Sequence, residues 1–255
     1  MDLRDQVVLV TGASAGIGRA CVRAFAAAGA RVAFCGRRRD RLEALAEELA
    51  AAGAEVHPFV LDVRRRQEVA AALAGLPEPF SAPGILVNNA GLSRGLDPIQ
   101  DGEWRDWEEM IETNVKGLLW VTRAVVPGMV ARGRGHVINI GSIAGREVYP
   151  GGAVYCASKH AVAAITRGLR LDLNQAGIRV STVDPGLVNT EFSTVRFRGD
   201  RTRADATYAG MTPLTAEDVA DAVLWAATRP AHVNVAEILL LPTDQAAATV
   251  VRRRG

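Results

Sequence analysis

The chain has 255 residues, of which 49% are apolar and 23% charged, and its formal net charge is +2. This length and composition predict one globular domain with a packed core. The balanced charge excludes bulk electrostatic attraction to nucleic acid or anionic membranes, and no uncharged apolar run reaches the roughly 20 residues that span a bilayer. The N-terminal MDLRD lacks the apolar run of a signal peptide, and three scattered cysteines argue against disulfides. We therefore expect a reduced, cytoplasmic protein with a small-molecule ligand.

Apolar β-branched runs alternate with helical stretches, which is the pattern of βαβ units around a parallel sheet. Pro127 is expected to kink or loosen the last turn of the longest helix. The polar segment 187–211 is long enough to be a lid on a single domain spanning 1–255. Strands are expected at 6–11, 31–35, 55–61, 85–89, 136–140, 178–183 and 237–241, and helices at 16–29, 40–52, 65–74, 104–131, 153–175 and 216–227.

Three glycines lie at the junction of the first expected strand and helix, in the order Gly-x3-Gly-x-Gly. Glycine lets the backbone approach a pyrophosphate, and the helix N-terminus supplies N–H donors and a positive dipole. Although a glycine trio can also form a simple tight turn, this location favours a dinucleotide site. The residues expected to contact the cofactor here are Gly12, Ser14, Gly16, Ile17 and Gly18.

The end of the second strand distinguishes NAD from NADP. An acidic side chain there would bind the ribose 2′-hydroxyl and repel a 2′-phosphate. This strand instead runs into Arg37 and Arg38, whose guanidinium groups suit a phosphate dianion. NADP(H) is therefore the expected cofactor, with a solvated charge cluster as the alternative. Asp62 and Val63, after the third strand, are expected at the adenine edge, and Asn89 in the cofactor cleft.

Tyr155 and Lys159 are four residues apart on an expected helix, so their side chains share one face. A neighbouring ammonium favours the phenolate, which lets a tyrosine take a proton from an alcohol or return one to a carbonyl. Lys159 is one of only two lysines, the other being Lys116. The pattern alone is weak, since most Tyr-x3-Lys pairs are surface pairs.

Two further polar residues strengthen the prediction of a catalytic site. Ser142 follows the fifth strand, at the edge where ligands bind in open α/β sheets. A hydrolase serine would require Gly-x-Ser-x-Gly, which is absent around Ser142. Asn114 is a polar residue in the long apolar helix, where it can stabilise a kink, relay protons, or both. The isolated histidines (His57, His136, His160 and His232) predict no metal site and are expected on the surface or on helices.

Together, these motifs resemble the full set of the short-chain dehydrogenase/reductase family, including Asn88-Asn89-Ala90-Gly91 and Pro185-Gly186. The resemblance spans essentially the whole chain. It implies a Rossmann-like, doubly wound α/β fold with a seven-stranded parallel sheet in three αβα layers. It also implies a catalytic tetrad, in which Lys159 holds the nicotinamide ribose and lowers the pKa of the tyrosine. The tetrad is Asn114, Ser142, Tyr155 and Lys159, and the nicotinamide side would be bound by Pro185, Gly186, Val188 and Thr190.

Less generic segments, among them 122–129, 192–200 and 229–234, are similar to a subgroup of that family, the NADP-dependent 3-hydroxy acid dehydrogenases. That resemblance implies hydride transfer between NADP(H) and a small 3-hydroxy or 3-oxo acid, and a homotetramer. Ser142 and Tyr155 would contact the substrate, and Arg196 or Arg198 would pair with its carboxylate. The segment Gly145-Arg146-Glu147-Val148 is more charged than the resemblance leads one to expect, which leaves the individual substrate open.

Two alternatives remain at this stage. One is a reductase acting on a bulkier ketone, acyl thioester or secondary metabolite with the same tetrad. The other is a regulator that senses NADP(H) without turnover. A sensor needs the glycine turn but not the acid–base residues, so the intact tetrad argues against it.

Overall fold

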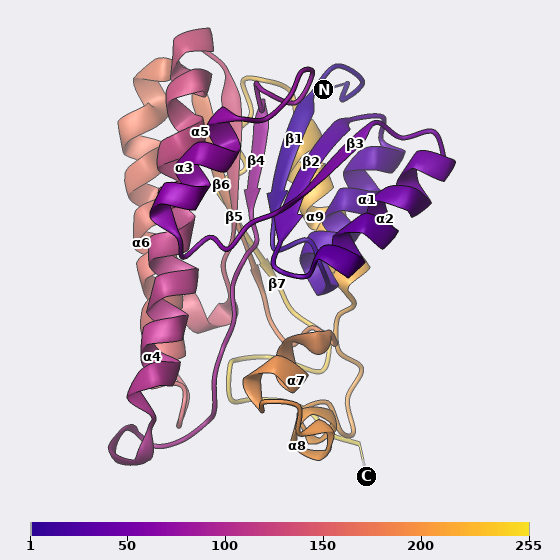
Figure 1. The fold of residues 1–255 in the computed structure, drawn as a ribbon. Coiled ribbons are helices and arrows are strands. Elements are labelled where there is room, and N and C mark those ends of the chain that lie inside the picture. The colour runs from indigo at the N-terminus through magenta and orange to yellow at the C-terminus, as the bar shows by residue number, and fades with distance from the viewer. Residues whose placement is uncertain (1, 255) are drawn as a thin grey trace.

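The computed structural model describes residues 2–254 and contains one seven-stranded parallel sheet between two layers of helices (Figure 1). The strands lie in the order β3-β2-β1-β4-β5-β6-β7. This confirms the Rossmann-like α/β fold. The strands are β1 (Val7–Thr11), β2 (Arg31–Gly36), β3 (Val56–Val60), β4 (Ile85–Asn88), β5 (Gly135–Ile140), β6 (Ile178–Pro185) and β7 (Glu237–Leu240).

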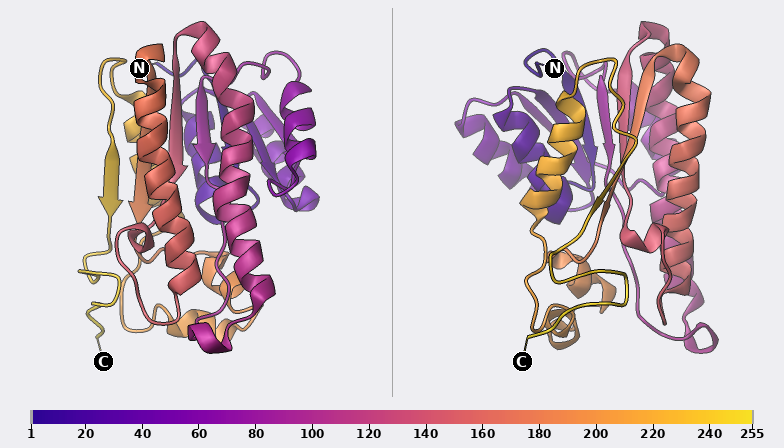
Figure 2. Two further views of the ribbon diagram at one scale, coloured as in Figure 1. Left: turned by 90° about the vertical axis from the view of Figure 1, so that its left-hand side faces the viewer. Right: turned by 180° about the vertical axis from the view of Figure 1, so that it is seen from behind.

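The helices cover both faces of the sheet, so the strands in its centre are buried on both sides (Figure 2). One apolar cluster joins the sheet to α1 (Gly16–Ala27), α2 (Arg39–Ala51) and α9 (Ala216–Thr228). A second cluster joins its other face to α3 (Arg66–Ala74) and α5 (Leu118–Arg132). The same layer contains α4 (Trp104–Ile111) and α6 (Ala153–Leu173). Within residues 2–254, no helix is long and apolar enough to cross a membrane.

The strand order reverses between β1 and β4, and this reversal indicates where a ligand site is expected. The chain leaves these neighbouring strands toward opposite faces of the sheet, and ligands of open α/β sheets bind beyond the carboxyl ends of such strands. The short helices α7 (Glu191–Arg196) and α8 (Arg201–Ala206) lie beyond this edge (Figure 1). They are formed by the segment 187–211, which was predicted only to be polar and long enough to act as a lid.

The long helix expected over 104–131 is interrupted. α4 ends at Ile111, a π-helical turn spans Glu112–Gly117, and α5 continues to Arg132. The apolar spacing did not reveal this turn, because a π-turn adds a residue without removing the helical periodicity. Pro127 lies inside α5, and the helix continues past it to Arg132.

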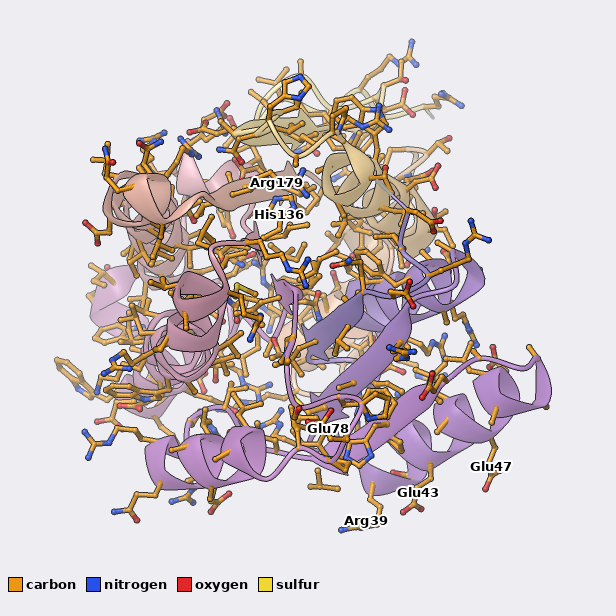
Figure 3. All side chains as sticks on the ribbon, turned by 90° about the horizontal axis from the view of Figure 1, so that it is seen from above. Arg39, Glu43, Glu47, Glu78, His136 and Arg179 are labelled. Carbon is orange, nitrogen blue, oxygen red and sulfur yellow. The ribbon has the colours of Figure 1, made fainter. Side chains whose placement is uncertain are left out.

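The prediction for His136 was wrong, because it lies on β5 with only 1% of its surface exposed. His57, on the edge strand β3, is partly exposed, which agrees with the expected surface position. The Nε2 atom of His136 is 2.7 Å from Ser181 Oγ. Figure 3 shows His136 beside Arg179, whose guanidinium donates to carbonyl oxygens at the end of α9, including Ala227 O at 3.0 Å. The error arose because a central strand is buried on both faces, so even its polar side chains lie inside.

The outer layer shows the opposite behaviour. Arg39, Glu43 and Glu47 point away from the sheet along α2 (Figure 3), and Arg39 and Glu43 form an exposed ion pair at 3.4 Å. Leucines on the other side of α2 are buried in the core. This amphipathic division is what the helical spacing predicted.

Candidate active site

The glycine turn between β1 and α1 requires glycine at each of its three positions. Gly12 and Gly16 have φ of 68° and 50°, in the left-handed region that favours glycine. A Cβ atom on Gly18 would lie 2.3 Å from Asn89 Nδ2 and 2.5 Å from the carbonyl oxygen of Gly12. The N-terminus of α1 has no side-chain cap and no acidic residue in its first turn. These features fit a bound pyrophosphate, which such a helix end attracts.

Asn89 joins the end of β4 to this turn. Its Nδ2 atom donates to the carbonyl oxygens of Thr11 at 2.9 Å and Gly12 at 3.2 Å. The hydroxyl of Thr11 accepts in return from the backbone N–H groups of Asn89 and Ala90. Asn89 therefore fixes the shape of the glycine turn, a structural role beside its expected place in the cofactor cleft.

The two arginines after β2 differ in their contacts. Arg38 donates to Ser14 Oγ from Nε at 3.1 Å and from one terminal nitrogen at 3.0 Å. Its other terminal nitrogen donates to Glu191 at 2.8 Å. Arg37 lies 3.7 Å from Glu109. Arg38 and Ser14 thus form a cationic, hydroxyl-bearing corner beside the glycine turn, which fits a ribose 2′-phosphate.

Asp62 and Val63, which were expected at the adenine edge, follow the end of β3. Arg64 binds the carboxylate of Asp62 with contacts of 2.6–3.0 Å. Hydrogen bonds from Arg64 outweigh the effect of partial burial and hold the pKa of Asp62 below its usual value. Val63 is buried and packs against Gly117, where a Cβ would lie 2.7 Å from the valine side chain. Val63 therefore also supports the π-turn.

Asn114 lies in the π-turn, and its side-chain amide is satisfied by the protein. Its Oδ1 accepts from Leu92 N at 2.8 Å, and its Nδ2 donates to Leu92 O at 2.8 Å and to Ser158 Oγ at 3.0 Å. The amide therefore joins the π-turn, the chain after β4 and helix α6. This is the kink-stabilising role considered from the sequence.

The other three members of the expected tetrad come together at the carboxyl edge of β5. Tyr155 and Lys159 are both buried on α6, and Ser142 is buried in the turn after β5. The Ser142 side chain lies next to that of Tyr155 and acts to lower the tyrosine pKa. Lys159 Nζ donates to the carbonyl oxygen of Ile140 at 2.9 Å, two residues before Ser142. The structure thus brings a serine hydroxyl, a phenol and an ammonium to one buried place.

The pKa values of Tyr155 and Lys159 are shifted in a different way from the one expected. Burial raises the pKa of Tyr155 above its usual value and Tyr149 adds to this effect, whereas Arg196 and Ser142 oppose it. The expected lowering of the tyrosine pKa by Lys159 is therefore not found. Burial also lowers the pKa of Lys159 to about 8, opposed by the carboxylate of Asp184. Desolvation dominates at both groups because each side chain is enclosed by the protein.

The chain after β6 leads from the sheet to α7 along the glycine turn. Pro185 is buried at the end of β6, and a Cβ on Gly186 would lie 2.2 Å from Gln245 Oε1. The carbonyl oxygen of Val188 accepts from the Tyr208 hydroxyl at 2.8 Å. Thr190 caps α7 by accepting from Phe192 N, and its side chain is 3.2 Å from where a Gly16 Cβ would lie. Thr190 is therefore close enough to the glycine turn for its expected role.

Arg196, at the end of α7, lies among aromatic rings at the chemical end of the site. Its guanidinium carbon is 5.3 Å from the ring centres of Tyr155 and Phe192 and 5.9 Å from that of Tyr149. One terminal nitrogen donates to the Tyr149 hydroxyl at 2.9 Å. Its Nε–H is buried and has no hydrogen-bond partner. An unpaired buried donor of this kind is costly and suits an anionic acceptor.

Arg198, the other cation considered for the substrate carboxylate, is engaged elsewhere. Its guanidinium pairs with Asp106 on α4, and 57% of its side chain is exposed. A small pocket beside Tyr155 is lined by Asp106, Trp107, Met110 and other residues of α4 and its approach. Arg198 therefore joins the segment 187–211 to the wall of this pocket, while Arg196 points to the reaction end.

Several contacting residues were not singled out from the sequence. Glu191 binds both Arg38 and Arg41, and so attaches α7 to the cationic corner. Arg94 pairs with Glu109 at 2.7 Å and donates to the carbonyl oxygen of Val195. These pairs are separated by 15 to 153 positions, so no local spacing could have identified them. The start of α7 could have been predicted from Thr190 and Glu191, because a threonine N-cap followed by an acidic residue in the first turn is typical of a helix N-terminus.

A glycine turn at the β1/β4 switch point, a cationic corner after β2 and a buried Ser–Tyr–Lys group define a dinucleotide-dependent oxidoreductase. The family model described as short chain dehydrogenase matches residues 6–200, and the chain belongs to this family.

Curated relatives match nearly end to end. The chain is 49% identical to the NADP-dependent 3-hydroxy acid dehydrogenase YdfG of Salmonella typhi, covering 95% of this chain and 97% of that protein. It is 48% identical to sulfoacetaldehyde reductase 2 of Chromohalobacter salexigens, covering 95% and 96%. A solved structure, the closed form of serine dehydrogenase complexed with NADP+, superposes with a TM-score of 0.93 at 47% identity, covering 98% of this chain and all of that one.

Proposed function

We propose that this protein is an NADP(H)-dependent dehydrogenase that interconverts a small 3-hydroxy acid and the corresponding 3-oxo acid. The reaction class follows from membership of the short-chain dehydrogenase family. NADP as the cofactor is supported by the Arg38–Ser14 corner, and by relatives and a solved neighbour whose names include NADP. The small acid is supported by Arg196, whose buried Nε–H is unpaired beside the Tyr155 ring. That unpaired donor is the observation that carries the substrate class.

When bound, the cofactor supplies the hydride acceptor or donor. The chain supplies the proton transfer and the orientation of the substrate. Ser142 binds the substrate oxygen beside the Tyr155 hydroxyl, and Tyr155 takes the proton of the alcohol or returns one to the carbonyl. Lys159 does not lower the pKa of the resting Tyr155, so in this proposal its charge favours the phenolate only as it forms during the reaction. Asn114 keeps α6 and the π-turn at a fixed distance. Arg196 binds the carboxylate and so sets which carbon faces the cofactor.

The segment 187–211 acts as the lid in this proposal. It carries Arg196 at one end of α7 and is tied to the cationic corner by Glu191 at the other. Closure over the substrate would exclude water from the reacting atoms and strengthen the contact with Arg196. The tetramer remains a prediction. It is consistent with exposed Leu171 and the small, solvent-facing Ala157 and Ala164 on the outer side of α6, and sedimentation tests it.

The experiment compares Tyr155→Phe with the unaltered protein. The substitution removes the hydroxyl and keeps the ring, so kcat for oxidation of 3-hydroxypropionate, serine or 3-hydroxybutyrate with NADP falls about a thousandfold. Affinity for NADPH, measured by fluorescence titration, stays within about twofold. Retained turnover in Tyr155→Phe would contradict the proposal, and NADPH binding without turnover in the unaltered protein would favour the sensor.

A second substrate class has a specific observation in its favour. Sulfoacetaldehyde reductases are among the relatives, and a sulfonate is an anion that Arg196 can also bind. Reduction of sulfoacetaldehyde and of a 3-oxo acid, assayed side by side with NADPH, separates the two. Activity confined to bulky uncharged ketones would contradict both and support the alternative reductase.

A further inference from the structure

The turn after β5 encloses the side chain of Lys159. Residues 140–146 supply the carbonyl oxygen of Ile140, which accepts from Lys159 Nζ at 2.9 Å, and the hydroxyl of Ser142. The same turn packs closely on α6, because a Cβ on Gly145 would lie 2.7 Å from the carbonyl oxygen of Lys159. The position of this turn therefore determines both the site of the ammonium and that of the serine.

A buried carboxylate lies directly beneath this turn. Only 5% of the Asp184 side chain is exposed, and its Oδ1 accepts from the Thr182 hydroxyl at 2.6 Å. A Cβ on Gly141, the residue between Ile140 and Ser142, would lie 1.9 Å from that Oδ1. Asp184 thus occupies the space that any other side chain at position 141 would need, and it packs against the backbone that holds Lys159.

Arg146, at the end of the same turn, binds this carboxylate. Its Nε and one terminal nitrogen donate to Asp184 Oδ2 at 2.9 and 2.7 Å. The latter nitrogen also donates to Glu237 on β7 at 2.6 Å, and Glu237 accepts from Arg167 on α6 at 3.2 Å. Such partners offset the free-energy cost of burying a carboxylate. The unexpected charge at position 146 is therefore explained by a partner on β6.

We propose that Asp184, held by Arg146, is a positioning residue of the active site: its carboxylate fixes the turn that carries Ser142 and binds the Lys159 ammonium, and it places a negative charge beside that ammonium. The inference rests on the proposed function, since it acts through Lys159. It assigns a task to a carboxylate that touches neither substrate nor cofactor in the proposed reaction.

The charges around Lys159 and Asp184 determine the sign of the effect. They comprise the Tyr155 phenol and Arg167 on α6, Glu237 on β7, and Arg146 after the turn. Burial lowers the pKa of Lys159 to about 8, and Asp184 opposes this lowering. Without the carboxylate, Lys159 releases its proton at a lower pH. It then loses the charge that favours the Tyr155 phenolate, and activity decreases in the weakly alkaline range.

The experiment is a direct titration of Lys159. Because the chain has only two lysines, protein labelled with ¹³C at lysine Cε gives two side-chain resonances, and Lys116→Arg assigns them. In Asp184→Asn, which keeps the side-chain shape, we expect the Lys159 pKa to fall by about one unit. The exposed Lys116 serves as an internal reference in the same spectra. The alkaline limb of kcat/KM should move to lower pH by the same amount.

Glu237→Gln is the matched control, because it also removes a carboxylate bound to Arg146 but leaves the residue beneath Gly141 unchanged. The Lys159 resonance should titrate as in the unaltered protein. Arg146→Met is a second test, independent of Asp184→Asn folding. It leaves the Asp184 charge uncompensated, so Lys159 should titrate at higher pH.

An unchanged Lys159 titration in Asp184→Asn, or an equal shift in Glu237→Gln, would overturn the proposal. So would an unchanged or lowered Lys159 pKa in Arg146→Met. A loss of activity without any shift of the alkaline limb would assign Asp184 a purely structural role, and also overturns it. These titrations use protein without substrate, so their failure is distinct from failure of the Tyr155→Phe and substrate experiments.

Discussion

The two ends of the cleft are built differently. At the cofactor end, the glycine turn and Asn89 make contacts mainly through backbone atoms fixed by neighbouring strands. At the substrate end, Arg196, Tyr149 and Tyr155 meet as side chains from α7, the loop before α6 and α6 itself. A site built on close backbone contacts tolerates almost no change at its glycines, and at this end the Asn89 side chain also acts on the backbone of the turn. A site built from side chains can change specificity by a single substitution.

The largest effect is expected where backbone contacts are closest. In Gly18→Ala, the added methyl would meet Asn89 Nδ2 at 2.3 Å and the Gly12 carbonyl oxygen at 2.5 Å. Both atoms define the glycine turn, so we expect NADPH affinity to fall at least about 100-fold and unfolding to become easier by about 2 kcal/mol. Fluorescence titration and thermal denaturation measure these effects.

Gly168→Ala is the matched control for that substitution. A Cβ at Gly168 on α6 meets nothing within 4 Å. Alanine is the better helix former, so the free energy of unfolding should stay equal or rise by up to about 1 kcal/mol. Equal losses in both variants would mean that the glycine turn is no more sensitive than the rest of the chain, and the contrast between the two ends would fail.

A smaller and more selective effect is expected at the substrate end. Arg196→Met keeps an apolar stem against the rings of Tyr155 and Phe192 but removes the buried Nε–H donor. A hydrogen bond to a charged group contributes about 1.5–3 kcal/mol, so kcat/KM for 3-hydroxy acids should fall about 30-fold. Oxidation of an alcohol without a carboxylate should change little, and NADPH affinity should be unaffected.

Arg198→Met tests whether the position of the cation matters. Arg198 is bound to Asp106 and is more than half exposed, so its loss should change kcat/KM for hydroxy acids by less than about threefold. If Arg198→Met were the more damaging variant, the carboxylate would lie on the other side of the lid. If neither variant altered KM, the assignment of Arg196 would be wrong.

The same division explains what the sequence could predict. The parallel sheet and the glycine turn follow from short-range patterns, since β-branched runs and glycine spacing act within a few residues. The Tyr155–Lys159 pair was readable because four residues make one helical turn. The partners of Arg146, Arg38 and Arg94 could not be predicted from the sequence. Each partner lies 15 or more positions from its arginine, and the contact depends on how the layers pack.

The burial of the Lys159 and Tyr155 side chains also could not be predicted from the sequence. Residue spacing indicates that Lys159 and Tyr155 share a helix face, but not that both side chains are enclosed. Desolvation therefore reversed the expected direction of the tyrosine pKa. The π-turn at Asn114 was not predicted for a related reason. Its stabilising contacts to Leu92 and Ser158 join residues that are far apart in the sequence.

A further effect, on stability and not on activity, is expected inside the sheet, away from both ends. Burial lowers the pKa of His136 from 6.5 to about 3, so the folded protein takes up this proton only in strong acid. The unfolded chain takes it up below about pH 6.5. Stability from the neutral imidazole is thus complete above that pH and is lost as pH falls toward 3. Between pH 7.5 and 5.5 the loss should be about 1.4 kcal/mol, measured by urea denaturation.

His136→Gln should flatten this pH dependence, because an amide can still bond Ser181 but does not titrate. His57→Gln is the control: its pKa is also lowered, but the ring is only partly buried, so its share of the slope should be smaller. An unchanged slope in His136→Gln would show that the ring titrates in the folded sheet as it does in the unfolded chain. In that case the loss of stability in acid would come from carboxylates that bind the segment 187–211. The sheet would then not be the pH-sensitive part of the molecule.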